Sequence, residues 1–149
     1  MRSAADRRHA IFHGWNNLAL LHPWNILGDG MGCDVEYTDE FGTWYETLIE
    51  GIQDDIDRAV GMLEARGPQL PFPYSSGIEG SRHTHMRELR IQSGSEPYRV
   101  FYAFDPRRTA ILLIGGSKAG HDRFYETMIP VADRLYEEHL IEIRKEGLI

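Results

Sequence analysis

Eight basic side chains are concentrated between positions 82 and 123, a stretch that holds only four acidic ones. Its local field would attract a phosphate-bearing polyanion even though the whole chain is acidic. An ordinary solvated surface is the other interpretation, because modest patches of one sign are common. The basic residues are Arg82, Arg87, Arg90, Arg99, Arg107, Arg108, Lys118 and Arg123, with His83, His85 and His121 among them.

Other common catalytic signatures are missing from the sequence. His83 and His85 are two residues apart, which does not suit a zinc pair, and no further Cys or His completes a tetrahedral set. We therefore expect no metal and no cofactor. The run from Gly115 to Lys118 lacks the preceding glycine of a phosphate-binding loop, and no Gly-x-Ser-x-Gly elbow occurs. The single cysteine, Cys33, has no thiolate-activating motif beside it.

The size and composition of the chain indicate one folded domain. It has 149 residues, of which 42% are hydrophobic and 26% charged, values typical of a packed globular protein. The net charge is −7, and residues 33–66 alone carry ten acidic groups against two basic ones. No apolar run approaches the ~18 to 20 residues that cross a bilayer, and one cysteine cannot form an internal disulfide. We expect a cytoplasmic protein without membrane contact.

The first 32 residues differ from the rest of the chain. They mix His, Trp and Asn with Gly28-Asp29-Gly30 and show neither a strand nor a helix period. Their short apolar patch is interrupted by His22 and Pro23 and does not match a signal peptide. We expect residues 1–32 to be an extension outside the core fold, such as an over-called translation start would add. Residues 33–149 would then form the functional domain.

The pattern becomes regular after this extension and predicts a strand followed by two helices. The strand covers residues 33–37, and Thr38 or Asp39 can cap the helix that follows. Apolar residues in that helix recur at i, i+3, i+4 and i+7 up to Leu48, and a second stripe runs over residues 52–63. Such stripes are typical of a core rather than of a ligand site.

Three strands are predicted beyond a loop rich in Pro, Gly and Ser that runs to Ser81. Residues 86–92 and 98–104 are separated by a turn that contains Gly94, and this arrangement predicts an antiparallel hairpin. Residues 109–114 form a continuous apolar run, typical of a central strand that is covered on both faces.

A final helix is predicted from Asp122 to about Lys145, with Pro130 either kinking it or starting a new helix. The order β-α-α-β-β-β-α predicts an α+β fold. In that fold, helices pack on one face of a small, mostly antiparallel sheet, and the opposite face is free to bind a ligand.

Several segments together resemble the phage-derived HigB-like toxins of the RelE/ParE superfamily, which belong to type II toxin–antitoxin systems. The residues that carry the resemblance are Glu-Leu-Arg at 88–90, Tyr-Arg-Val at 98–100, Lys118, and Phe-Tyr at 124–125. It covers roughly residues 33–142, keeps the element order of the family and stops at the N-terminal extension. The resemblance implies the RelE-like fold.

The activity implied by this resemblance is that of an mRNA interferase, a ribosome-dependent endoribonuclease that inhibits translation and arrests growth. Such toxins need no metal, because the 2′-hydroxyl of the RNA attacks the adjacent phosphate and leaves a 2′,3′-cyclic product. The reaction requires a proton acceptor, cations around the phosphate and a proton donor for the leaving oxygen. DNA lacks the nucleophile and cannot react in this way.

The resemblance assigns the phosphate contacts to Arg90 and Arg99, which match basic family positions on the second and third strands. A guanidinium presents a fixed fork of donors and keeps its charge, so it suits charge stabilisation better than proton transfer. The alternative for Arg90 is an ion pair with Glu88 or Glu36, and for Arg99 a pair across the hairpin.

The remaining catalytic candidates follow the third strand. Lys118 would act as an acid or a phosphate clamp, and Tyr125 matches a family aromatic that stacks on a base or assists proton transfer. The alternatives are an exposed lysine and a tyrosine that packs on the sheet. His121 has the intrinsic pKa best suited to proton transfer, and we expect one of the three histidines to be catalytic. The expected RNA-binding residues are Arg82, His83, His85, Arg87 and Arg123.

One departure from the family leaves the general base open. RelE carries two lysines on its second strand, whereas alternation from Arg90 places Glu88 and Met86 on that face and Arg87 on the other. Two other functions share this fold: a ParE-like gyrase inhibitor, and an inactive homologue that serves only as a corepressor.

The partners implied by the resemblance are a cognate helix-turn-helix antitoxin of the HigA type, the ribosome and mRNA. The sequence leaves open whether the antitoxin binds the basic face or the acidic pair of helices.

Overall fold

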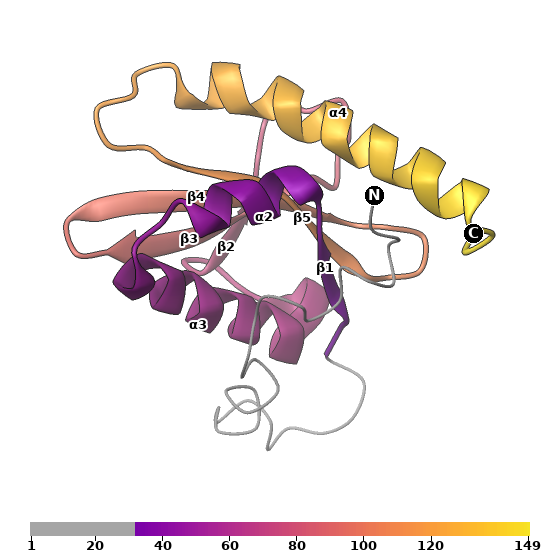
Figure 1. Ribbon diagram of the computed structural model, residues 1–149, viewed down its shortest axis with the longest axis horizontal. Helices are drawn as coiled ribbons and strands as arrows, with labels where there is room; N and C mark the ends of the chain where they lie inside the picture. Colours follow the sequence, from indigo (N-terminus) through magenta and orange to yellow (C-terminus); the bar gives the residue numbers. More distant parts are fainter. Residues whose placement is uncertain (1–31) are drawn as a thin grey trace.

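The computed structural model describes residues 32–149, so the proposed extension lies outside the described residues except for Gly32. The described chain begins with a strand and two helices, continues through four strands and ends in a long helix (Figure 1). Their bounds are β1 Val35–Tyr37, α2 Asp39–Glu46, α3 Glu50–Arg66, a 3-10 turn Gly67–Gln69, β2 Ser75–Gly77, β3 Arg87–Ser93, β4 Glu96–Phe104, β5 Ala110–Ser117 and α4 Phe124–Lys145. None of these helices is both long enough and apolar enough to cross a membrane.

The five strands form one sheet in the order β1-β5-β4-β3-β2. All neighbours are antiparallel except β1, which runs parallel to β5. The predicted α+β class and the order of the predicted elements are confirmed. The prediction missed β2, because its sequence Ser-Ser-Gly has no apolar alternation and its backbone hydrogen bonds to β3 alone define it as a strand.

Helices α2 and α3 cover one face of the sheet, as the two apolar stripes predicted. Thr38 caps α2, since its hydroxyl accepts a hydrogen bond from the backbone N–H of Phe41 at 3.0 Å. Phe41 and Tyr45 of α2 and Ile56 and Leu63 of α3 are buried against β1, β3, β4 and β5. This cluster forms the larger of two cores.

The opposite face, which we expected to be open, is covered in part by α4. Ile129 and Leu135 of this helix pack against Phe101 of β4 and Leu113 of β5. Figure 1 shows the sheet between α3 on one side and α4 on the other. The physical reason is that β4 and β5 carry apolar side chains on both faces, which must be buried on both.

Two local predictions in this region have clear outcomes. The hairpin between β3 and β4 is confirmed, with Gly94 at φ +59°, a conformation that favours glycine in a two-residue turn. Pro130 neither ends α4 nor begins a second helix, because the helix continues through it to Lys145.

The packing of α2 on the sheet requires a glycine at position 115. A Cβ built on Gly115 would overlap three ring carbons of Trp44, and that ring is held between Phe41 and Tyr98 at centroid distances of 5.7 and 6.4 Å.

We expect Gly115→Ala to lower the free energy of unfolding by about 1 to 3 kcal/mol, because the core must shift to admit one methyl group. Gly51→Ala is the matched control, since Gly51 lies in the first turn of α3 with open space around it. There we expect a small gain in stability, as alanine favours helix. Urea unfolding measures both variants, and equal effects would contradict this account of Gly115.

Candidate active site

The carboxylate of Glu88 lies at the centre of the polar cluster on the α4 face of the sheet. Alternation along β3 points Leu89 and Ile91 toward α3, and thus Glu88 and Arg90 toward the other face. Glu88 is only 3% exposed. Its oxygens accept hydrogen bonds from the Ser76 hydroxyl at 3.0 Å and from the Tyr125 hydroxyl at 2.8 and 3.1 Å.

Arg90 and Arg99 face each other directly across the β3–β4 hairpin. Like charges in opposite positions repel, and Glu88 lies close enough to compensate them. Its Oε1 is 3.3 Å from Nη1 of Arg90 and 3.8 Å from Nε of Arg99. The three side chains carry a net charge of one positive unit, so the cluster keeps an attraction for an anion.

The two arginines differ in their freedom. The side chain of Arg90 is 30% exposed and can meet a ligand, whereas Arg99 as a residue is 6% exposed. Arg99 donates from Nη1 to the Tyr98 carbonyl at 3.0 Å, while its Nε has no hydrogen-bond partner among the described residues. Arg99 thus holds a buried, unsatisfied donor next to a partly exposed cation.

Tyr125 and Lys118 complete this cluster. Tyr125 lies in the first turn of α4, and the Lys118 ammonium is 5.0 Å from the centre of its ring. Burial raises the pKa of Tyr125, and the hydrogen bond to Glu88 raises it further, while Arg99 opposes the shift. The phenol is therefore protonated at neutral pH and acts as a donor.

His121 and Arg123 lie at the same end of α4 but outside the cluster of contacts around Glu88. His121 is exposed, and its ring meets the ring of Phe124 edge-on at 5.8 Å, which in turn lies 5.3 Å from that of Tyr125. The exposed Arg123 is 3.5 Å from Glu126. His121 is the histidine nearest in sequence to Lys118 and Tyr125.

The other predicted RNA-binding residues lie elsewhere. Arg82 and His83 contact Glu137 at 3.0 and 3.3 Å, and His85 contacts the hydroxyl of Tyr136 at 3.1 Å. These α4 residues lie roughly 16 to 18 Å along the helix axis from Tyr125.

Arg87 points to the α3 face and donates from Nε to the Ser75 hydroxyl at 3.1 Å. The sequence prediction that Arg87 and Arg90 lie on different faces agrees with this placement.

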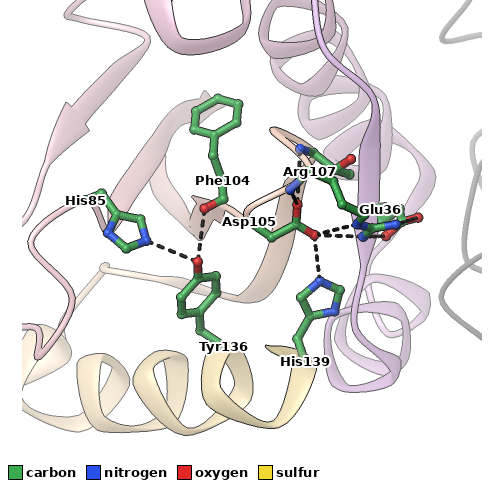
Figure 2. A network of polar contacts seen from close by, with 8 residues as sticks. Glu36, His85, Phe104, Asp105, Arg107, Tyr136 and His139 are labelled. Atoms are coloured by element: carbon green, nitrogen blue, oxygen red, sulfur yellow. Dashed lines mark hydrogen bonds and ion pairs between the residues drawn. The ribbon is translucent and has the colours of Figure 1, made fainter. Parts of the chain in front are cut away.

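A second buried network joins β1, the β4–β5 turn and α4 (Figure 2). Arg107 lies 2.6 Å from Glu36 and 2.7 Å from Asp105, and Asp105 lies 3.0 Å from Nε2 of His139. Glu36, Asp105 and His139 offer ligand atoms within 4.8 Å of one another, a donor set that could hold a metal ion. The Arg107 guanidinium already supplies the positive charge there, so this network is a structural ion cluster.

Glu88 and this ion cluster are the main features that the sequence did not identify. The sequence places Glu88 on the same face as Arg90, as its possible partner, and it groups Arg107 with the other basic residues of a patch. Ser76 was assigned to a loop. Each of these contacts depends on chain segments far apart in the sequence, which local patterns do not reveal.

Comparisons with known proteins match most of this chain. Residues 43–137 match the family described as phage derived protein Gp49-like (DUF891), and this range contains all five predicted catalytic residues. A Mycobacterium tuberculosis protein provisionally named toxin HigB2 is 37% identical over 121 residues, 78% of this chain and 59% of HigB2. Another from the same organism, provisionally named toxin HigB3, is 39% identical over 98 residues, 65% of this chain and 84% of HigB3. The chain thus spans less than two thirds of HigB2.

The ion cluster predicts a specific dependence of stability on acid. Burial alone would raise the pKa of Asp105, but hydrogen bonds from His139 and Arg107 outweigh it and hold the pKa below its ordinary value of 3.8. The stability contributed by this lowered pKa is fully present above pH 3.8 and is lost as the pH falls through the pKa of the folded state.

We expect Asp105→Asn to lower the free energy of unfolding at neutral pH and to remove this acid-dependent loss. Urea unfolding at pH values on both sides of 3.8 measures the free energy of unfolding of wild type and variant. Glu40→Gln, at an exposed position, is the control. Parallel pH dependences of wild type and Asp105→Asn would contradict the assignment.

Proposed function

The chain belongs to the phage-derived Gp49-like (DUF891) family, and on that basis we propose that it is the toxin of a type II toxin–antitoxin pair. The relatives named HigB2 and HigB3 support this proposal. We propose further that the toxin is an endoribonuclease that cuts mRNA on the ribosome and thereby stops translation. Its compartment would be the cytoplasm.

The observation that carries the nuclease proposal is the convergence of Arg90, Arg99 and Tyr125 on Glu88, with Lys118 alongside. In the proposed reaction the 2′-oxygen attacks the adjacent phosphorus, the bond to the 5′-oxygen breaks, and a 2′,3′-cyclic phosphate forms. Arg90 and Lys118 would stabilise the negative charge that builds on the phosphate oxygens. The buried Arg99 would add its positive charge to theirs. This arrangement requires no metal ion.

Glu88 would act in this reaction as a positioning residue. It orients the Arg90 guanidinium through a hydrogen bond. In the absence of RNA, the Tyr125 hydroxyl donates its proton to the same carboxylate. When a phosphate enters, the phenol can turn to donate a hydrogen bond to it. The proton transfers themselves need an acid–base side chain, and His121 is the exposed histidine at this end of α4.

A helix-turn-helix antitoxin of the HigA type is the partner that this function implies. Helices α2 and α3, which carry most of the acidic residues of 33–66, cover one face of the sheet. The cluster around Glu88 lies on the opposite face. An antitoxin that bound only one of these two surfaces would leave the other exposed. We propose residues 33–149 as the active unit, with residues 1–32 dispensable. An adjacent small reading frame for a helix-turn-helix protein would support the pairing.

The first prediction for the nuclease concerns Arg90. We expect Arg90→Gln to reduce mRNA cleavage about 100- to 1,000-fold, because one stabilising cation is lost from the transition state. In vitro translation followed by primer extension measures the cuts. Arg144→Gln is the matched control, since this exposed arginine near the end of α4 removes the same charge elsewhere.

Growth of cells that express the protein is measured beside the cleavage assay, and the two results together distinguish the candidate functions. Cleavage by wild type and by Arg144→Gln, but not by Arg90→Gln, supports the proposal. Intact mRNA together with growth arrest would point to a ParE-like gyrase inhibitor. Intact mRNA without growth arrest would point to a corepressor, which the partial neutralisation of both arginines by Glu88 favours as the second candidate.

The second prediction separates His121 from His85. We expect His121→Gln to reduce cleavage about 100-fold or more, as removal of a general acid or base does. His85→Gln should leave cleavage unchanged, because its partner is Tyr136 in the middle of α4. Full activity of His121→Gln would remove this residue from the mechanism.

A further inference from the structure

A pocket of about 400 Å³ opens beside the two arginines, between α3 and the outer edge of β3. Its walls include Ala59 and Met62 of α3 and Ile91 of β3, and Arg90 and Arg99 line it as well. This volume lies within the range of sites that bind small organic groups. Arg90 and Arg99 are therefore shared between this pocket and the cluster around Glu88.

The pocket exists because β2 is short. β2 pairs with β3 only from Arg87 to Leu89, and the Tyr74 carbonyl then accepts the Arg90 N–H at 2.9 Å. Beyond Arg90 the edge of β3 has no neighbouring strand in the described sheet. Pro73 and Tyr74, which precede β2, line the pocket together with residues of α3.

Two aromatic side chains near this pocket are exposed to solvent. Phe72 is 69% exposed, and Tyr74, which lines the pocket, is 38% exposed. The Arg90 guanidinium lies 5.2 Å from the centre of the Phe72 ring. An exposed aromatic ring paired with an arginine is the surface on which bases of single-stranded RNA stack.

The chemistry of the pocket fits a nucleotide better than a purely apolar ligand. Its apolar walls suit the faces of a flat ring, while Gln92 and Arg58, which also line it, offer hydrogen-bonding groups. The side chain of Arg90 is 30% exposed and can meet a phosphate beside that ring, and Arg99 lines the same pocket. A base with its attached phosphate combines these two requirements in one ligand.

We propose that this pocket binds a nucleobase of the RNA next to the phosphate held by Arg90. The base stacks on Tyr74 in the pocket wall and on Phe72, which lies outside the lining and contacts Arg90. This inference rests on the proposed function, because it assigns the RNA substrate to the same cluster. It gives the toxin a means of preferring one nucleotide beside its cut. A peptide strand that pairs with the free edge of β3 is the competing occupant.

The test uses a short oligoribonucleotide whose 2′-O-methyl groups prevent cleavage. A set of such oligonucleotides carries 2-aminopurine at a different single position in each member. Stacking on an aromatic ring quenches 2-aminopurine fluorescence. With the full chain and programmed ribosomes, we expect quenching at one position only. We expect Phe72→Ala to abolish it and to weaken binding about tenfold.

Further variants separate stacking from folding. Phe72→Trp should retain the quenching, and Tyr74→Leu should reduce it. Ile141→Ala removes a side chain on α4 that is also exposed, at 52%, and should change nothing. Unchanged quenching in Phe72→Ala would overturn the proposal, and so would the absence of quenching by wild type at every position. Displacement of the oligonucleotide only by a strand-forming peptide would also overturn it.

The cleavage assay distinguishes this failure from that of the proposed function. Position-specific quenching by a wild-type chain that leaves mRNA intact would keep the pocket and reject the nuclease. Cleavage without quenching, and with the same cut sites in Phe72→Ala, would keep the nuclease and reject the pocket.

Discussion

The carboxylate of Glu88 lies under α4 with almost no exposure to water, and a charge in that position is tolerated only when its partners surround it. Those partners come from four elements: Ser76 of β2, Arg90 of β3, Arg99 of β4 and Tyr125 of α4. The edge strand, the hairpin and the start of the helix must all be in place before this charge is compensated. The geometry of the candidate site follows from that requirement.

The ion cluster around Arg107 meets a similar requirement further along the same helix. Here a buried cation is held between Glu36 of β1 and Asp105, and His139 ties Asp105 to α4. The helix is thus fixed to the sheet by polar contacts at two places, with the apolar residues Ile129 and Leu135 packed between them. Such contacts define which way α4 lies on the sheet, which apolar packing alone specifies less strictly.

Much of the fold could be predicted from the sequence because its signals are local. The helix stripes, the Gly94 turn and the apolar run of β5 each depend on residues close together in the chain. The hairpin itself was predicted from this turn, whereas the register that places Arg90 opposite Arg99 comes from the structure. The rest depends on contacts between distant segments: Glu88 meeting Tyr125, the attachment of His83 and His85 to α4, and the burial of Arg107. A count of charges along the sequence cannot distinguish a buried guanidinium from a free one.

The parallel pairing of β1 with β5 has a consequence for synthesis. Val35 pairs with Ala110, so the first described strand leaves the ribosome long before its neighbour exists. Until then α2 and α3 can only cover an incomplete sheet, and non-local pairings of this kind form late in folding. Tyr125 is made later still. A nascent chain that stops before α4 therefore carries the arginines but not the helix that orders them, and the assembled cluster is a property of the nearly finished polypeptide.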